Sequence, residues 1–314
     1  MSRHATPRRY LMCRPTYFEV TEARTPWMNP DDPVDTDAAC RQWEHLRERL
    51  RAFGHTVEEL TPLPGAPEMV FAANGATVID GRALGARFAH PERVPEAAAH
   101  RAWLIAHGIT AYREPEHANE GEGDYAPTAS CLLAGHGFRT TPASHAEARH
   151  FFGRPVLALE LVDPRYYHLD TALAVLDPAT DAVMYHPEAF SAASRAVLRH
   201  RFPDAVLADS THAAALGLNA VSDGQHVLLP EAARDLFPAL RARGFEPVGV
   251  DLSELAKRAA ARSGIRRRTA ASGNDDRARR IRRVLPPHRG FVGHARRRPR
   301  RNGGRRPHHR RPAR

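Results

Sequence analysis

The sequence contains little cysteine and no long apolar run. Its three cysteines, Cys13, Cys40 and Cys131, show no paired spacing, which argues against a secreted disulfide scaffold and favours a reducing compartment. No stretch of about 18 apolar residues is present, so we expect no membrane span. Residues 1–9 lack the apolar core of a signal peptide. Together these absences predict a cytoplasmic protein.

Lysine is almost missing as well, since Lys257 is the only one in the chain. The formal net charge of +10 is divided unevenly along the sequence. Of the 46 basic and 36 acidic residues, 22 and 2 fall in residues 257–314, which leaves 24 basic and 34 acidic residues in residues 1–256. We therefore expect an acidic domain over 1–256, long enough for one large fold, and a basic tail over 257–314.

The tail is rich in arginine, proline, alanine and glycine, the residues written by codons made of G and C. This composition favours an out-of-frame reading of a GC-rich gene over a disordered basic tail or a folded element. High charge and few large apolar residues predict that the tail is disordered. It has little aromatic interleaving beyond Phe291, so any nucleic-acid binding would be non-specific and sensitive to salt.

A repeat becomes visible when the ends of the predicted helices are compared. Most of these helices close on a glycine, which readily adopts the left-handed conformation found after helix ends, and each leads into a β-like run. The helices are expected near 36–53, 94–107, 144–152, 188–201 and 231–243, and four of them close at Gly54, Gly108, Gly153 and Gly244.

Short β-like runs fill the intervals between the helices. They are Ala76–Ile79, Ala83–Arg87, Cys131–Leu133, Ala172–Leu176 and His226–Leu229. Their spacing predicts an α/β fold of five strand–strand–helix–strand units, because a doubly wound sheet would alternate single strands with helices. A mixed α/β domain with accidental spacing is the alternative.

Two motifs bring together side chains suited to acid–base chemistry. In Asn119-Glu-Gly-Glu-Gly-Asp124 the glycines allow a tight turn that could bring carboxylates to a cleft, although an acidic surface turn would look the same. In Tyr166-Tyr-His-Leu-Asp170, a strand would point His168 and Asp170 to one face, where the carboxylate would fix the imidazole tautomer. Alone, His168 could equally be a buried structural histidine.

Two further segments supply polar and cationic groups. Met69-Val-Phe-Ala-Ala-Asn-Gly75 is an apolar run that closes on a polar turn, and a core strand with a turn cap is its plainer interpretation. Arg87-Phe-Ala-His-Pro-Glu-Arg93 places cations after a strand, where a solvated charge cluster is the default.

Taken in this order, the motifs resemble the dimethylarginine dimethylaminohydrolase and amidinotransferase superfamily, over about residues 8–256. The bacterial dimethylarginine hydrolase-like branch is most similar, on the evidence of Asn74 and His90-Pro-Glu-Arg93. The resemblance implies a five-bladed α/β propeller and chemistry on a guanidinium carbon without metal or cofactor. A cysteine thiolate attacks that carbon, and a histidine protonates the leaving amine and then activates water.

The resemblance also assigns roles to individual residues. His168 would be the acid and base, Glu120 its acidic partner, and Asp170 would bind substrate or orient His168. The acidic motif is one residue longer than the common form, so Glu122 could replace Glu120. The substrate would be held by residues from four motifs: Phe71, Asn74, Arg87, Asp124 and Arg139. Asn74 stands where many relatives have an aspartate, and Arg87 and Arg139 would hold the substrate's α-carboxylate.

The chain departs from the family after Leu255, where a glycine-rich turn, the cysteine and a short last strand are expected. It has Ala259-Ala-Ala-Arg-Ser-Gly264 instead, and its three cysteines all lie in segments that predict a structural role. Three functions therefore remain open: an amidine hydrolase, an inactive protein that binds arginine analogues, and an amidinotransferase. A nucleic-acid binder is less favoured. The guanidine substrate is not specified, and a homodimer is one option for the assembly.

Overall fold

The computed structural model describes residues 3–19 and 32–259 of the chain, and it has an α/β fold of five separate sheets. Four sheets have three strands and the fifth has two among the described residues. Among the described strands, no sheet closes on itself. The expected α/β class with strand–strand–helix–strand units is therefore confirmed.

The four three-stranded sheets repeat one plan. A first strand runs antiparallel to a middle strand, a helical segment follows, and a third strand returns parallel to the middle strand. The first unit has β3 (Ala76–Ile79), β4 (Arg82–Gly85), α2 (Val94–Ala106) and β5 (Ala111–Arg113). The second has β6 (Tyr125–Pro127), β7 (Leu132–His136), α3 (Pro142–Phe152) and β8 (Val156–Glu160).

The third and fourth units follow the same order with shorter pieces. The third has β9 (Leu173–Asp177), β10 (Ala182–Tyr185), α4 (Ala192–Arg201) and β11 (Val206–Leu207), followed by α5 (Ser210–Ala214). The fourth has β12 (Val221–Ser222), β13 (His226–Pro230), a 3-10 helix (Glu231–Leu236) running into α6 (Phe237–Ala242), and β14 (Glu246–Val250).

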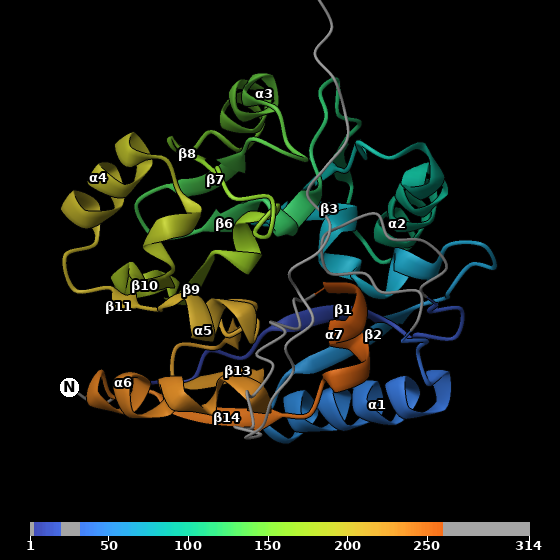
Figure 1. Cartoon of the computed structure of the whole chain (residues 1–314). Coiled ribbons are helices and arrows are strands. Elements are labelled where there is room, and N and C mark those ends of the chain that lie inside the picture. Colours follow the sequence, from blue (N-terminus) through green and yellow to red (C-terminus); the bar gives the residue numbers. More distant parts are fainter. Residues whose placement is uncertain (1–2, 20–31, 260–314) are drawn as a thin grey trace, which may run out of the picture. The chain divides into compact units, whose positions relative to one another are not determined.

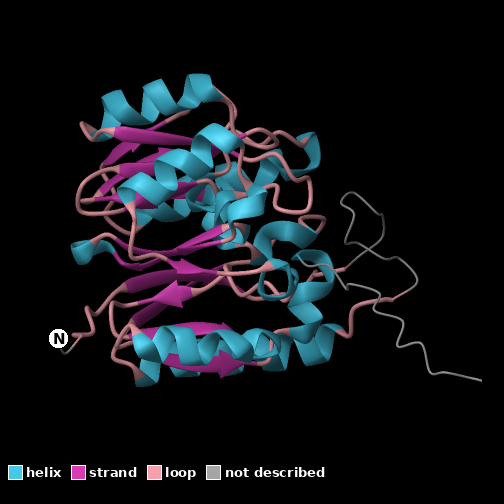
Figure 2. Ribbon diagram, turned by 60° about the vertical axis from the view of Figure 1, so that its left-hand side comes forward, coloured by secondary structure: helices cyan, strands magenta, loops and turns pink. Residues whose placement is uncertain are grey.

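The fifth sheet comes from the N-terminal part of the described chain. It consists of β1 (Arg9–Cys13) and β2 (Thr56–Leu60), which pair in parallel, with α1 (Thr36–Ala52) between them in sequence. The last described helix, α7 (Ser253–Ala259), packs on α1. In Figures 1 and 2 the larger helices lie outside and the strands lie between them.

The glycines mark helix ends as the sequence predicted. Gly153 is the left-handed residue that closes α3, with a φ of 65°. Gly54, Gly108 and Gly244 also have positive φ values and follow α1, α2 and α6 within two residues. Because a side chain is strained at such angles, glycine lets each helix end and the chain turn into the next strand.

Two local expectations are wrong. The run from Tyr166 to Asp170 is not a strand but a loop entering a 3-10 helix, Leu169–Thr171. Met69–Gly75 is not a core strand with a cap, because the 3-10 helices Pro67–Val70 and Ala72–Gly75 occupy it. In both places short 3-10 helices stand where the sequence pattern predicted an extended strand.

The apolar core lies mainly between the second, third and fourth units. One cluster contains Leu133, Leu159, Leu173, Tyr185 and Leu229, from five different strands, all almost fully buried. Because each strand alternates its side chains between two faces, these residues pack neighbouring sheets against each other. The core therefore fixes the relative positions of the turns that precede the first strands.

A buried carboxylate links the fifth sheet to the fourth. Asp223 accepts a 2.7 Å hydrogen bond from Nδ1 of His226, and Nε2 of His55 lies 3.4 Å from the same oxygen. The backbone N–H of Thr6 also donates to the Asp223 carbonyl. Burial alone would raise the pKa of Asp223, but the hydrogen bonds from His226 and backbone N–H groups lower it, so the group is ionised.

The basic segment begins inside a described helix. Lys257, expected in the tail, belongs to α7 and contacts Asp32 and Glu254 at 3.1 and 2.9 Å. The predicted disorder, and the out-of-frame interpretation of 257–314, otherwise fall on residues 260–314, which lie outside the described residues. Within 3–19 and 32–259, no helix is long and apolar enough to cross a bilayer.

We expect Asp223→Asn to lower the free energy of unfolding at pH 7 by about 1–3 kcal/mol, since hydrogen bonds to a buried charge are lost. Chemical denaturation followed by circular dichroism measures this. Asp209→Asn is the matched control, because Asp209 is an exposed helix cap and asparagine caps a helix equally well. Equal losses in the two variants would show that the contacts of the Asp223 carboxylate with His226 and His55 add no stability.

Candidate active site

The candidate site is built from short turns that precede the first strands of successive units. Asn74 lies in the turn before β3, Glu120 and Asp124 flank the turn before β6, and His168 begins the turn before β9. The repeated plan thus brings residues about fifty positions apart to one place. Of the residues predicted for the site, Glu120 and Asp124 come together with His168 through direct contacts. One cavity beside them is lined by five others: Phe71, Asn74, Arg139, His168 and Asp170.

The centre of the site is an imidazole held between two buried carboxylates. Nε2 of His168 lies 3.3 Å from Oε2 of Glu120, and Nδ1 lies 3.1 Å from Oδ2 of Asp124. The partner that orients the imidazole is thus Asp124, whereas sequence alternation had offered Asp170 for that role. With carboxylates on both nitrogens, the ring is held as an imidazolium that donates on each side.

The charges in this centre stabilise each other. Burial would lower the pKa of His168, but Asp124 and Glu120 raise it to about 10. Burial would raise the pKa of Glu120, but the hydrogen bond and charge of His168, with Arg93 and Arg139, lower it to about 2. At neutral pH the site therefore contains a cationic histidine that can donate a proton.

Backbone geometry holds the two carboxylates in place. Asp124 accepts hydrogen bonds from Thr140 Oγ1 at 2.6 Å and from the Leu169 N–H at 3.1 Å. Gly121, at a φ of 56°, packs so closely on the preceding turn that an added Cβ would lie 2.6 Å from the Ala73 carbonyl oxygen. Only glycine fits there, and this close approach lets Asn74 donate to the Glu120 carbonyl at 3.3 Å.

Two arginines contact Glu120, and one of them was not predicted. Arg139 Nη1 lies 3.4 Å from Glu120, and its guanidinium stacks over the ring of Tyr167. Arg93 Nη1 also lies 3.4 Å from Glu120 and is buried among Glu68 and Glu96. The motif Arg87–Arg93 was recognised in the sequence, but its last residue, not its first, enters the site.

Arg87 does not join this group. Its side chain is exposed and does not line the cavity, while its backbone forms a bridge with Asn119. Phe88 and Arg93 are the buried residues of this segment, and the Arg93 guanidinium lies over the Phe88 ring. The alternation of side chains along a strand could not indicate that Arg93 is buried, because Arg93 ends the 3-10 helix Pro91–Arg93 and does not lie in a strand.

The two glutamates of the acidic motif have separate environments. Glu120 contacts His168, whereas Glu122 accepts a hydrogen bond from the Val78 N–H at 3.2 Å. Glu122 is accessible within the cavity yet surrounded by protein, and this desolvation raises its pKa to about 7. The structure therefore pairs Glu120, not Glu122, with the histidine.

Asp170 faces the same cavity, which has a volume of about 520 Å³. Its backbone carbonyl accepts a hydrogen bond from Asn219 at 3.4 Å. Burial raises the pKa of Asp170 to about 6, against the opposing charge of His168. A carboxylate in this position can accept hydrogen bonds from a cationic ligand at neutral pH.

None of the three cysteines lies among these residues. Cys13 ends β1, Cys40 lies in α1 and Cys131 precedes β7, and all three are buried free thiols. Burial raises the pKa of Cys13 to about 12 and also raises that of Cys40. Their predicted structural role fits these surroundings, because a nucleophilic cysteine needs an accessible thiolate.

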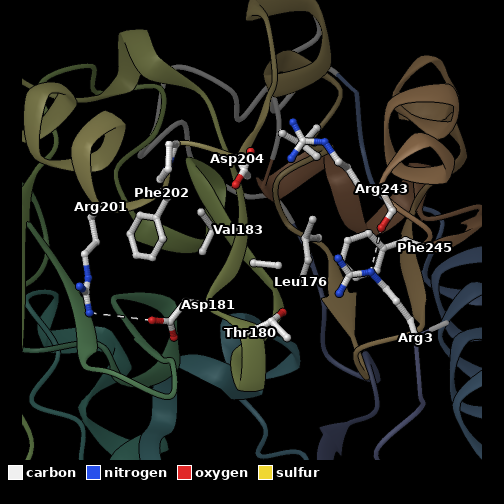
Figure 3. Close-up of a pocket in the computed structure, with 14 residues that line it drawn as sticks. Arg3, Leu176, Thr180, Asp181, Val183, Arg201, Phe202, Asp204, Arg243 and Phe245 are labelled. Atoms are coloured by element: carbon white, nitrogen blue, oxygen red, sulfur yellow. Dashed lines mark hydrogen bonds and ion pairs between the residues drawn. The ribbon is translucent and has the colours of Figure 1, made fainter. Parts of the chain in front are cut away.

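A second cavity, of about 270 Å³, has no comparable chemistry. It lies beside Arg3, Phe202, Arg243 and Phe245, between the third and fourth units (Figure 3). Its charged groups are partly paired, with Arg3 on Asp177 at 3.1 Å and Arg201 on Asp181 at 3.9 Å. Among the described residues, no group of His, Cys, Asp and Glu side chains is arranged to hold a metal ion.

Comparison with known proteins gives close relatives, although no family model matches the chain. It is 49% identical over 252 residues to the N(G),N(G)-dimethylarginine dimethylaminohydrolase of Mycobacterium tuberculosis, covering 80% of this chain and 82% of the relative. It is 31% identical over 255 residues to the bifunctional arginine dihydrolase/ornithine cyclodeaminase ArgZ of Synechocystis, covering 79% of this chain and 36% of that protein. The crystal structure of the ArgZ N-terminal domain, a cysteine-to-serine variant bound to substrate, has a TM-score of 0.75 at 30% identity and covers 80% of this chain and 94% of its own.

The charge on His168 predicts a pH-dependent contribution to stability. Because its folded pKa of about 10 lies above the ordinary value of 6.5, its stabilisation is complete below 6.5 and is lost as the pH rises through 10. We expect the loss of unfolding free energy in His168→Gln to shrink between pH 7 and pH 10 in urea titrations. His145→Gln is the control, since burial lowers the pKa of His145 and its loss should stay constant over that range. A constant loss in both variants would argue against a charged His168.

Proposed function

Because this chain belongs to the dimethylarginine dimethylaminohydrolase family of guanidine-modifying enzymes, we propose that its cavity binds a small guanidine such as arginine or dimethylarginine. The observation that carries the proposal is the buried contact of Glu120 and Asp124 with His168 beside the cavity-facing Asp170. We further propose that the five sheets form the blades of a five-bladed propeller over residues 1–256, in a cytoplasmic protein.

Acidic side chains are proposed to hold the substrate's guanidinium. Asp170 has the carboxylate that lines the cavity, and Glu120 is fully buried next to the cavity-lining residues His168 and Arg139. Charge-assisted hydrogen bonds from N–H groups of a guanidinium are about twice as strong as neutral ones. Asn74 contributes an amide where many relatives have an aspartate, so it adds a hydrogen bond without a charge.

Arg139 is proposed to hold the substrate's carboxylate. Phe71 is proposed to pack against the methylene chain of the substrate. Arg139 lies at the edge of the site, where its guanidinium rests on Tyr167 and one nitrogen contacts Glu120. A planar guanidinium can still offer its remaining N–H groups to a carboxylate in a bidentate manner. Arg87 was assigned the same role by resemblance, but its exposed side chain lies away from the cavity.

The proposed reaction uses His168 twice. A thiolate forms a C–S bond to the guanidinium carbon, the C–N bond to the leaving amine breaks, and His168 donates a proton to that amine. Neutral His168 then takes a proton from water, the hydroxide adds to the thiouronium carbon, and the C–S bond breaks to release thiolate and a urea. Asp124 orients the imidazole in both steps through Nδ1.

The chain as it stands has the acid, the base and the binding groups of this reaction but no cysteine at the site. Cys13, Cys40 and Cys131 are buried elsewhere in the described structure. We therefore propose that the full chain binds guanidines without hydrolysing them. This is the binding-only function that the sequence left open, and the missing thiol favours it over the transferase.

Binding can be tested separately from catalysis. We expect Asp170→Asn to weaken L-arginine binding at pH 7.5 by about tenfold or more, measured by calorimetry on the full chain, because a charge-assisted hydrogen bond is lost. Since the pKa of Asp170 is raised to about 6, affinity in the unchanged protein should fall as the pH drops from 7 to 5. Asp163→Asn, on the same loop but paired with Arg165, is the control and should bind normally. Equal affinity in both variants would remove Asp170 from the binding site.

Catalysis can be tested by restoring a nucleophile. The full chain should produce no citrulline from arginine or dimethylarginine above the uncatalysed rate. Replacing residues 260–314 with a glycine-rich turn, a cysteine and a short strand should create activity, which His168→Ala in the same variant should abolish. Activity in the unchanged chain that disappears in Cys13→Ser, Cys40→Ser or Cys131→Ser would identify another nucleophile and overturn the proposal.

A further inference from the structure

Thr140 contacts both acidic residues that flank His168, although the sequence pattern assigned it no role. It lies in the loop between β7 and α3 and is buried. Its Oγ1 lies 2.6 Å from Oδ2 of Asp124 and 3.2 Å from the backbone nitrogen of Glu120. One hydroxyl group therefore connects the two residues whose carboxylates hold the imidazole.

The direction of the Thr140 hydroxyl proton follows from these two neighbours. A backbone N–H can only donate, so the Glu120 N–H donates to Oγ1 and occupies one of its lone pairs. The single hydroxyl proton is then left for Asp124, whose carboxylate accepts it. Thr140 is thus at once a donor to Asp124 and an acceptor from Glu120.

Thr140 and His168 donate to the same oxygen of Asp124. Nδ1 of His168 lies 3.1 Å from Oδ2, the atom that also accepts the hydrogen bond from Thr140. The other oxygen, Oδ1, accepts from the Leu169 N–H at 3.1 Å. Because two donors on one oxygen draw on the same negative charge, each weakens the bond made by the other.

This competition affects how tightly His168 binds its second proton. A hydrogen bond from Thr140 stabilises the Asp124 carboxylate most when the imidazole is neutral, since no imidazolium then offsets the negative charge. The hydroxyl therefore favours the neutral imidazole relative to the imidazolium. With Thr140 in place, His168 is a stronger acid than it would be if Asp124 lacked this donor.

The residue before Thr140 acts on the other carboxylate in the same sense. Arg139 Nη1 lies 3.4 Å from Oε1 of Glu120, and Arg93 Nη1 lies 3.4 Å from Oε2 of the same group. A positive charge beside a carboxylate reduces the attraction of that carboxylate for the imidazolium. Two consecutive residues of one loop thus moderate the two carboxylates that hold His168, one carboxylate each.

The charged groups around His168 come from several turns. Three acidic groups and two cations face it or lie behind its partners: Glu120, Asp124, Asp170, Arg93 and Arg139. The ring of Tyr167 also lies 4.9 Å from the imidazole. Thr140 makes hydrogen bonds to two of these groups, Glu120 and Asp124, so a change at Thr140 reaches His168 through them.

We propose that Thr140 is a positioning residue of the candidate active site, whose hydroxyl orients Asp124 toward His168 and moderates the attraction of that carboxylate for the imidazolium. In the proposed reaction His168 gives a proton from Nε2 to the leaving amine and keeps the proton on Nδ1. A less basic Asp124 favours both, because it releases the Nε2 proton more readily and does not take the Nδ1 proton itself. The catalytic meaning of this role rests on the proposed function, whereas its effect on His168 does not.

Nuclear magnetic resonance of the full chain with labelled histidine measures the pKa of His168 without any guanidine present, and His168→Gln assigns the signal. Valine has the branched shape of threonine without its hydroxyl. We expect Thr140→Val to raise the pKa of His168 by about half a unit or more and to move its Nδ1 proton downfield, because Asp124 then binds the imidazolium more strongly. Thr140→Ser, which keeps the hydroxyl, should titrate like the unchanged chain.

Thr141→Val is the matched control. Thr141 is the next residue of the loop and is exposed, and its hydroxyl donates to the Ala118 carbonyl at 3.2 Å. This variant should leave the pKa of His168 unchanged. Equal pKa values in Thr140→Val and Thr141→Val, or a lower value in Thr140→Val, would overturn the proposal.

Thr140→Val also removes the acceptor of the buried Glu120 N–H, which destabilises the fold. If this variant does not fold, the hydroxyl proton of Thr140 in the unchanged chain gives the answer. Buried in a 2.6 Å hydrogen bond, it should exchange with water slowly enough to give its own signal, with a cross-peak to the Nδ1 proton of His168. A hydroxyl proton that exchanges freely with water would contradict the assigned donor.

Arginine binding to the unchanged chain, measured by calorimetry, separates this inference from the proposed function. The expected pKa difference between Thr140→Val and Thr141→Val without arginine binding supports the role of Thr140 and counts against the proposed function. Arginine binding together with equal pKa values in the two variants supports the proposed function and overturns the role of Thr140.

Discussion

The site depends on one buried ionic contact, the imidazolium of His168 between the carboxylates of Glu120 and Asp124. Two carboxylates buried this close would repel each other, and one would take up a proton unless a cation lay between them. Each partner of His168 comes from the turn before β6, while His168 itself comes from the turn before β9. The contact therefore forms only when the second and third units pack together, and the apolar cluster that joins those units is a condition for the chemistry.

The repeated unit explains how distant residues reach one place. In each complete unit a short turn precedes the first strand, and the strand then leads the chain away from the cavity. Turns of three or four residues can present polar side chains and backbone carbonyls without burying a long irregular segment. Gly121 shows how close this packing is, because a Cβ added there would lie 2.6 Å from the Ala73 carbonyl oxygen of the neighbouring turn. The scaffold thus places polar groups at the cavity and leaves the sheets apolar.

The sequence predicted the scaffold better than the contacts inside the site. Helix-ending glycines such as Gly153 and the spacing of the β-like runs were sufficient to predict the repeated strand–strand–helix–strand units, because both reflect local backbone preferences. Three assignments could be made only from the structure. They are Asp124, not Asp170, as the residue that orients His168; Arg93, not Arg87, as a cation beside Glu120; and Glu120, not Glu122, as the glutamate that contacts His168. Each pair lies in or beside a 3-10 turn, where neither the two-residue period of a strand nor the period of a helix tells which side chain faces inward.

The surroundings of His168 also differ from those of the cysteines in the part of the chain that the structure describes. A thiolate is stabilised by a nearby cation, and His168 is such a cation at neutral pH. Cys13 lies at the end of β1, whose residues Arg9 to Met12 line the cavity, yet burial and then the charge of Glu96 raise its pKa to about 12. Reactivity here is therefore a matter of position relative to His168, not of cysteine content. Packing between the second and third units holds His168 beside Glu120 and Asp124, whereas the three cysteines are buried at other places in the described structure.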